Sequence, residues 1–316
     1  MDFQLSDDQR ALRAGVRELL AGRFGRDRMR AALDDGTGVD RALWRELGEA
    51  GFFALRLPET EGGVGLGLPE SVLLFEEAGR SLLPGPLIAT HLAAGRVKGA
   101  AQGGTVVAVL DPGQPVAHLG EADALLVLGA GDGPQASAAS VDVSRVRDAA
   151  TPVRSVDPFT PLWRAEDPVE AGEPLPGGGR LRDEGALLAA AEQLGSAART
   201  TEMAVQHAGE REQFGAPIGS FQAVKHLCAG MLVRAELARC AVYAAAVTAD
   251  PVEIAGAKLL ADDAAVRNAR DCLQVHGGMG FTWEADVHLH LKRAWLRSGQ
   301  WLTAAVAEEV LAGDLC

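Results

Sequence analysis

The chain has 316 residues, enough for one large domain or two to three small ones that share a core. Its 30 basic and 43 acidic side chains give a net charge of −13, which argues against a nucleic-acid-binding or membrane-surface protein. Its four cysteines show no CxxC pair and no metal-like spacing with histidine, and the polar N-terminus is no secretory signal. These features predict a cytoplasmic protein with free, buried thiols and no metal site.

The first hundred residues have the pattern of helices. Ser6 and Gln9 form a capping box ahead of leucines and valines at helical spacing, and a second helix is expected after Asp40. Further helices are expected over 69–81 and 86–100. The glycine-rich segment 57–67 lacks a preceding strand and a following Lys or Ser, so it predicts a helix-connecting loop rather than a phosphate-binding loop.

The composition changes near Gly103. Short apolar runs bounded by Gly, Pro and Asp predict strands at 105–110, 124–128 and 140–143. A stretch rich in Pro and Gly, 170–179, marks a second boundary. The middle of the chain is therefore expected to form a small β-domain.

The last third returns to an alanine-rich helical pattern. Four long helices are expected over 184–209, 221–249, 252–276 and 283–312. Proline is confined to the connections between them, which favours an antiparallel four-helix bundle. The predicted fold is mostly α, with a helical domain (1–103), a middle β-domain (104–180) and a C-terminal bundle (181–316).

One motif lies where the first of these long helices is expected to end. In the segment 210–226, Arg211 could bind an anion bidentately, and Phe214 beside it could pack against a flat ring. Arg211 could equally cap the C-terminus of its own helix.

A second motif ends the third long helix. Gln274 is followed by His276 and by the pair Gly277 and Gly278, which would let a ligand approach the backbone closely. A glycine pair after a helix is also a common C-cap, and a lone histidine there is often structural.

These two motifs, in this order, resemble those of the acyl-CoA dehydrogenase family over nearly the full chain, supported by the segments 47–51, 57–63 and 191–195. The resemblance implies a helical, β and four-helix-bundle architecture that assembles as dimers or tetramers. It also implies a FAD site across a subunit interface. The residues that would contact FAD are Arg211 at the pyrophosphate, Phe214 near the adenine end, and Gln274, Gly277 and Gly278 around the pyrophosphate.

The chain departs from the family at the catalytic base, a glutamate that occupies one of two positions. Counting from the two motifs places Trp301 at one position and Gly185 at the other, so neither holds a carboxylate. Glu184 is adjacent, but one residue along a helix turns a side chain by about 100°, so Glu184 is expected to point elsewhere.

The middle domain departs as well, because it is short and its aromatic residues are only Phe159 and Trp163. The chain is thus expected to supply the residues that contact the FAD pyrophosphate but few of those that would contact the flavin ring. This combination resembles the short subunits of actinobacterial heterotetrameric acyl-CoA dehydrogenases of steroid degradation, whose full-length partner carries the glutamate and the ring pocket.

Three hypotheses remain open at this stage. The chain is a FAD-binding, non-catalytic subunit with a full-length partner; or it is a self-sufficient homomer that uses Glu184 as a displaced base; or it is a scaffold without flavin. The resemblance implies an acyl-CoA substrate and an electron-transfer flavoprotein as acceptor, without fixing the acyl chain.

Overall fold

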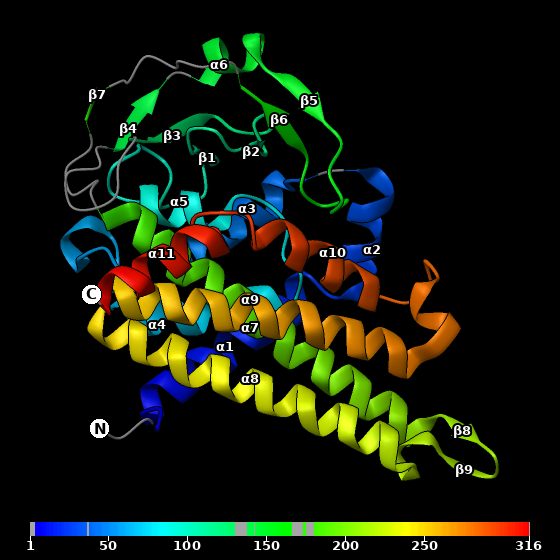
Figure 1. Ribbon diagram of the computed structural model, residues 1–316. Coiled ribbons are helices and arrows are strands. Elements are labelled where there is room, and N and C mark those ends of the chain that lie inside the picture. The colour runs from blue at the N-terminus through cyan, green and yellow to red at the C-terminus, as the bar shows by residue number, and fades with distance from the viewer. Residues whose placement is uncertain are drawn as a thin grey trace. The chain divides into compact units, whose positions relative to one another are not determined.

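The computed structural model describes residues 4–36, 38–129, 138–141, 143–165, 173–174 and 180–315. The chain forms two compact units, each assembled from separate stretches of sequence (Figure 1). The bundle unit comprises residues 1–21, 72–82 and 186–316, and the mixed unit comprises residues 22–71 and 83–185. The fold is that of a mostly helical protein with a small β region, as predicted, while the three-segment division of the chain remains a prediction.

The bundle unit is built from long, alanine-rich helices. Its helices are α1 (Asp7–Arg23), most of α4 (Leu68–Arg80), most of α7 (Leu181–Glu210), α8 (Gln222–Thr248), α9 (Pro251–His276), α10 (Val287–Arg297) and α11 (Ala304–Asp314). Between α7 and α8 lie β8 (Glu212–Gln213), β9 (Ala216–Pro217) and the short helix η3 (Ile218–Ser220), and η4 (Gly277–Phe281) follows α9. Figure 1 shows α7, α8 and α9 running alongside one another, with the β8–β9 hairpin at one end.

Local sequence signals set the helix starts. Ser6 and Gln9 exchange backbone-to-side-chain hydrogen bonds of 3.1 Å, so the predicted capping box is confirmed. Asp40 caps α3 (Arg41–Glu49) by accepting from two backbone amides, as expected for the second helix. Asp250 does the same for α9, with Pro251 at its first position.

The fourth predicted helix of the bundle is wrong as a single element. The segment 283–312 forms two helices, α10 and α11, separated by a turn in which Trp301 has a φ of 65°. A non-glycine residue in the left-handed region cannot continue an α-helix, so the chain changes direction there.

The mixed unit carries the β region. Its helices are α2 (Arg26–Asp35), α3, η1 (Glu59–Glu61), α5 (Leu87–Ala93) and α6 (Val143–Ala149). Its strands are β1 (Val107–Leu110), β2 (Val116–Ala117), β3 (Ala124–Leu128), β4 (Ala138–Val141), β5 (Thr151–Val153), β6 (Leu162–Arg164) and β7 (Glu173–Pro174). One sheet has the order β1-β3-β4-β7, with β1 and β3 parallel, and a second has the order β2-β6-β5.

The strand predictions fare unevenly. The strand at 124–128 is confirmed in full, and that at 105–110 is shortened to β1. The third prediction is wrong at Val143, which begins α6 and buries its side chain against the β1 and β3 residues of the core. The helix expected over 86–100 is shortened to α5. Most of the predicted boundary 170–179 lies outside the described residues.

Helices α4 and α7 cross within the bundle unit at two reciprocal glycines. A Cβ atom on Gly195 of α7 would lie 1.9 Å from the carbonyl oxygen of Glu76, and one on Gly79 of α4 would lie 2.0 Å from that of Glu192. Only glycine allows two helix backbones to approach this closely. The close packing of α4 against α7 therefore explains why the segment 191–195 ends in a glycine, Gly195.

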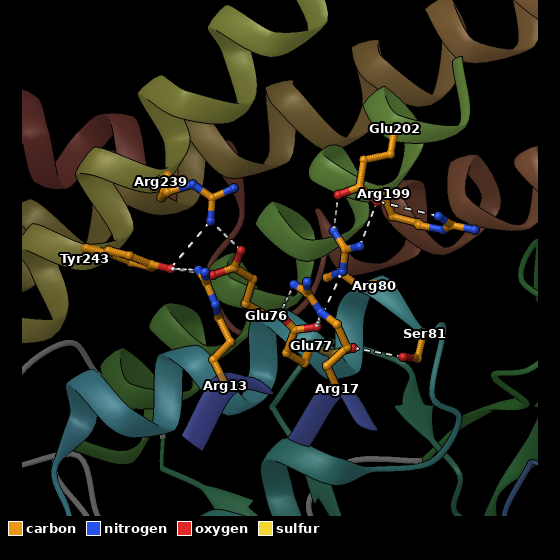
Figure 2. A network of polar contacts seen from close by, with 10 residues as sticks. All are labelled: Arg13, Arg17, Glu76, Glu77, Arg80, Ser81, Arg199, Glu202, Arg239 and Tyr243. Carbon is orange, nitrogen blue, oxygen red and sulfur yellow. Dashed lines mark hydrogen bonds and ion pairs between the residues drawn. The ribbon is translucent and has the colours of Figure 1, made fainter. Parts of the chain in front are cut away.

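A polar network ties α4 to α1, α7 and α8 of this unit, and its contact with α7 is an ion pair of 2.7 Å between Arg80 and Glu202 (Figure 2). Glu77 is buried and accepts two hydrogen bonds from Arg17 of α1, at 2.8 and 2.6 Å. Glu76, also buried, is bound by Arg239 and by the Tyr243 hydroxyl of α8, the latter at 2.7 Å. The pKa of Tyr243 rises to about 12 because the phenol is largely buried and lies against the Glu76 carboxylate.

Cysteine exposure partly contradicts the sequence prediction. Cys228, Cys240 and Cys272 are free, but only Cys272 is buried as expected, since Cys228 is partly buried and Cys240 is exposed. Cys316 lies outside the described residues. Across the helices of the described chain, none is long and apolar enough to cross a membrane.

Candidate functional site

The first motif forms a tight hairpin at the C-terminal end of α7. Strands β8 and β9 pair antiparallel, and the two residues between them, Phe214 and Gly215, have φ values of 54° and 75°. Positive φ at both central residues is the pattern of a type I′ turn, which favours glycine or asparagine. Phe214 adopts this conformation and is 95% exposed. An aromatic side chain held at a strained, solvent-facing turn points to a role in binding.

Arg211 is the first residue beyond α7, and its backbone is fixed on both sides. Its amide donates to the His207 carbonyl at 2.9 Å, and its carbonyl accepts from the Ile218 amide at 2.7 Å. The guanidinium itself is exposed and makes no hydrogen bond or ion pair with any described residue. Among the described residues, the Arg211 guanidinium does not cap α7 by a hydrogen bond, and its donors remain available to an anion.

The second motif, at the end of α9, exposes backbone atoms rather than side chains. Helix α9 ends at His276, and Gly277 follows with φ 60° and ψ −142°, a conformation that favours glycine. A Cβ atom added at Gly277 or Gly278 would meet no atom within 4 Å, so the backbone there is open. Gln274, one turn earlier, is exposed. Gly280, in contrast, is buried against Leu273 and His276.

A histidine pair brings the two motifs together at the same end of the bundle unit. The rings of His207 on α7 and His276 on α9 stack with centroids 4.1 Å apart and an interplanar angle of 18°. His276 Nδ1 lies 2.8 Å from the Cys272 carbonyl, so its N–H donates into the last turn of α9. Burial, and then the neighbouring His276 and Arg211, lower the pKa of His207. The pair was not identified from sequence, where His276 was expected to be a structural histidine.

These residues fit half of a dinucleotide site. An arginine with no internal partner and an open glycine backbone match a doubly charged pyrophosphate. Phe214 lies edge-on to Phe221, with ring centroids 6.1 Å apart, and could stack on a flat base. The five predicted contacts, Arg211, Phe214, Gln274, Gly277 and Gly278, are all exposed within the described chain.

The two positions at which the sequence predicts a catalytic base hold no carboxylate. Gly185 lies within α7, and the Trp301 side chain is 8% exposed. Glu184 is engaged by Arg56 in the mixed unit, at 2.7 Å to one carboxylate oxygen and 3.3 Å to the other. A guanidinium in bidentate contact occupies the carboxylate oxygens that a base would use.

Sequence reasoning missed a buried group of charges in the bundle unit. Glu192 of α7 pairs with Arg297 of α10 at 2.9 Å, and Lys258 pairs with Asp262 within α9. Burial raises the pKa of Glu192, against the opposing effect of Arg297 and Arg293, and burial lowers the pKa of Lys258. In the sequence, these buried charges are visible only as isolated charged residues within alanine-rich helices. In the described residues, no three His, Cys, Asp or Glu are grouped to hold a metal ion.

Comparison with known proteins decides the family. The family model described as "Acyl-CoA dehydrogenase, C-terminal domain" matches residues 182–298, and "Acyl-CoA dehydrogenase, N-terminal domain" matches residues 6–105. The chain is 37% identical to the acyl-CoA dehydrogenase IpdE2 of Mycobacterium tuberculosis (strain ATCC 25618 / H37Rv), covering 91% of each protein. The chain belongs to the acyl-CoA dehydrogenase family. It is thus a member of a family of oxidoreductases that act on CH–CH bonds.

Two solved structures extend the comparison. A Tcur3481-Tcur3483 steroid ACAD matches with a TM-score of 0.83 and 26% identity, over 98% of this chain and 97% of that chain. PigA, solved with FAD and proline, matches with a TM-score of 0.85 and 20% identity, over 100% of this chain and 99% of that chain. At this identity PigA shares the fold alone.

Proposed function

We propose that this chain is a non-catalytic, FAD-binding subunit of a heteromeric acyl-CoA dehydrogenase. In this assembly it would hold the FAD pyrophosphate in trans for a full-length partner that carries the catalytic glutamate and the ring pocket. The observation that carries the proposal is a mismatch between the two halves of the site. The residues that we assign to the pyrophosphate are exposed, whereas Trp301 and Gly185 occupy the two positions at which the family resemblance implies the base.

Each assigned residue has a task set by its surroundings. Arg211 would bind the pyrophosphate through two parallel N–H donors, and the amides of Gly277 and Gly278 would complete the anion site. Gln274 would orient the same group by a hydrogen bond, and Phe214 would pack on the adenine. When bound, FAD supplies the hydride acceptor for α,β-dehydrogenation of an acyl-CoA thioester.

The self-sufficient alternative depends on Glu184, and its contact with Arg56 argues against it. To act as a base, Glu184 would have to leave a bidentate ion pair in which its side chain is only 13% exposed. The name of the steroid ACAD relative favours a bulky, polycyclic acyl group as the substrate of the assembly.

Native mass spectrometry of the chain alone and after co-expression with a full-length homologue would test the proposal. We expect no stable FAD with the chain alone, and half as many FAD molecules as polypeptide chains in the mixed assembly. The substitution Arg211→Gln should remove FAD from the mixed assembly. Arg267→Gln, on the exposed surface of α9, is the matched control and should retain it. An active homomer with one FAD per chain, inactivated by Glu184→Gln, would refute the proposal.

A further inference from the structure

Two helix C-termini meet beside the residues that we assign to the pyrophosphate. Helix α7 ends at Glu210 and α9 ends at His276, and the stacked rings of His207 and His276 hold these two ends together. The C-terminus of a helix carries about half an elementary negative charge, so two such ends repel a doubly charged pyrophosphate. Arg211 offsets only part of this repulsion. A second positive charge at this place would therefore strengthen the binding of an anion.

His276 can supply that charge, but only after its ring takes up a proton. Its Nδ1 lies 2.8 Å from the Cys272 carbonyl oxygen, and because a carbonyl can only accept, Nδ1 carries the proton of the neutral ring. Nε2 then presents a lone pair, which repels an oxyanion. Nε2 makes no hydrogen bond with any described residue, and the side chain is partly exposed. Protonation turns Nε2 into a donor and leaves the Nδ1 hydrogen bond in place.

The ring of His207 favours a single proton on the pair. The two rings are nearly parallel, with centroids 4.1 Å apart, so two positive charges at this distance would repel each other. Burial, and then His276 and Arg211, lower the pKa of His207. His207 is therefore the ring that stays neutral, and His276 is the ring that can become charged.

Few other groups face the pair from the neighbouring elements. The short helices η3, which packs on α7, and η4, which packs on His276, contain no titratable residue. Burial raises the pKa of the two nearby thiols, that of Cys272 to about 12, so both stay uncharged near neutral pH. The charged and titratable neighbours on α7, α8 and α9 are Glu210, Arg211, Cys228 and Cys272. Among these groups and the pair, imidazole is the one that changes charge near pH 7.

We propose that a pyrophosphate bound here brings one proton from solvent onto His276, whose Nε2–H then donates to a pyrophosphate oxygen. The inference rests on the proposed function, because it concerns the same pyrophosphate. A bound anion favours the charged form of the ring, so the imidazole has a higher pKa in the complex than in the free chain. Affinity should therefore be greatest at low pH and should fall as the pH rises from the free to the bound pKa.

Isothermal titration calorimetry of the full chain with ADP-ribose would test this proton uptake. ADP-ribose is a pyrophosphate diester whose own charge is constant near neutral pH, so a pH dependence would come from the protein. Buffers of different ionisation enthalpy reveal how many protons are taken up. We expect uptake of up to one proton near pH 7. We also expect the affinity to fall about tenfold between pH 6 and pH 8, because a pKa that rises by one unit changes the affinity tenfold.

Three variants separate His276 from its neighbours. His276→Gln should bind ADP-ribose about tenfold more weakly at pH 6, match the unsubstituted chain at pH 8, and take up no proton. His207→Phe keeps a flat ring in the stack and should retain the pH dependence. His226→Gln is the matched control, because His226 is an exposed histidine whose Nε2 lies 3.3 Å from the Gln222 amide nitrogen on α8. If His276→Gln kept the pH dependence, or if either other variant lost it, the proposal would be wrong.

The outcomes also distinguish this inference from the proposed function. Arg211→Gln should abolish ADP-ribose binding at both pH values. Equal affinity of the unsubstituted chain at pH 6 and pH 8, without proton uptake, would overturn the role of His276 and leave the pyrophosphate site intact. Absence of ADP-ribose binding at pH 6 would also overturn that role, and the proposed function would stand if the mixed assembly still retained FAD. A mixed assembly without FAD would overturn both.

Discussion

Replacing Gly195 by alanine should destabilise the protein, although helix propensity alone predicts the opposite. Alanine in a helix interior is favoured over glycine by about 1 kcal/mol. At this position, however, the new methyl group would lie 1.9 Å from the Glu76 carbonyl oxygen and 2.9 Å from the Arg80 amide nitrogen of α4. Both are backbone atoms, so no side-chain rotation can relieve the overlap.

The magnitude follows from the displacement that the methyl group requires. Restoring an ordinary carbon–oxygen separation of about 3.4 Å would move the two backbones apart by about 1.5 Å. Overpacking of this kind typically costs about 1–3 kcal/mol and sometimes more, and here it also disturbs the reciprocal contact of Gly79. After the propensity gain is subtracted, we expect a net loss of about 2 kcal/mol or more. At about 2–4 °C per kcal/mol, the melting temperature should fall by at least about 4 °C.

Urea unfolding followed by circular dichroism, together with thermal melting, would measure the change. Gly15→Ala provides the control, because Gly15 lies within α1 and a Cβ there meets no atom within 4 Å. That substitution should be neutral or stabilising by up to about 1 kcal/mol. If Gly195→Ala behaved like Gly15→Ala, the close crossing of α4 and α7 would be wrong.

Three further predictions concern single side chains. Tyr243 is the only tyrosine in the sequence, so ultraviolet titration should report its pKa near 12 rather than 10, and Glu76→Gln should lower it; a midpoint near 10 would contradict the network. Burial lowers the pKa of His290 to about 3 and that of His91 to about 4, so the unfolded chain binds more protons than the folded chain. Stability should therefore fall from pH 6.5 towards pH 4 by about 1.4 kcal/mol per pH unit for each histidine, and His290→Gln should reduce the slope measured by urea unfolding. Trp301→Gly should be more stable than Trp301→Ala by about 1 kcal/mol in the same assay, because both lose the indole but only glycine favours φ 65°; equal stabilities would argue against the left-handed turn.

The sequence predicts element boundaries correctly where neighbouring residues mark them. Ser6 with Gln9 and Asp40 marked helix starts, and the strand at 124–128 was bounded by residues that break strands. The break at Trp301 is not predicted by the single long helix expected there, although Ser298-Gly299 just before it is a dipeptide typical of turns. Val143 was misassigned because apolar alternation over four residues also fits the start of a helix that buries one side.

For the candidate site, the sequence proposes the residues and the structure shows what surrounds them. Whether Arg211 capped its own helix could not be decided from composition, because both roles need the same residue at the same place. The engagement of Glu184 by Arg56 joins positions 128 residues apart, and no local pattern predicts such a pair. The stacking of His207 on His276 is equally non-local.

The discontinuous make-up of the bundle unit governs the order in which the chain can fold during synthesis. Helix α1 is synthesised before its partners on α4 and α8, and the bundle unit also requires α9, α10 and α11. The segments of the mixed unit are all available by residue 185, well before α8 exists. The apolar face of α1 therefore stays uncovered until α8 has been made, so the newly made α1 is a natural point of contact for a chaperone.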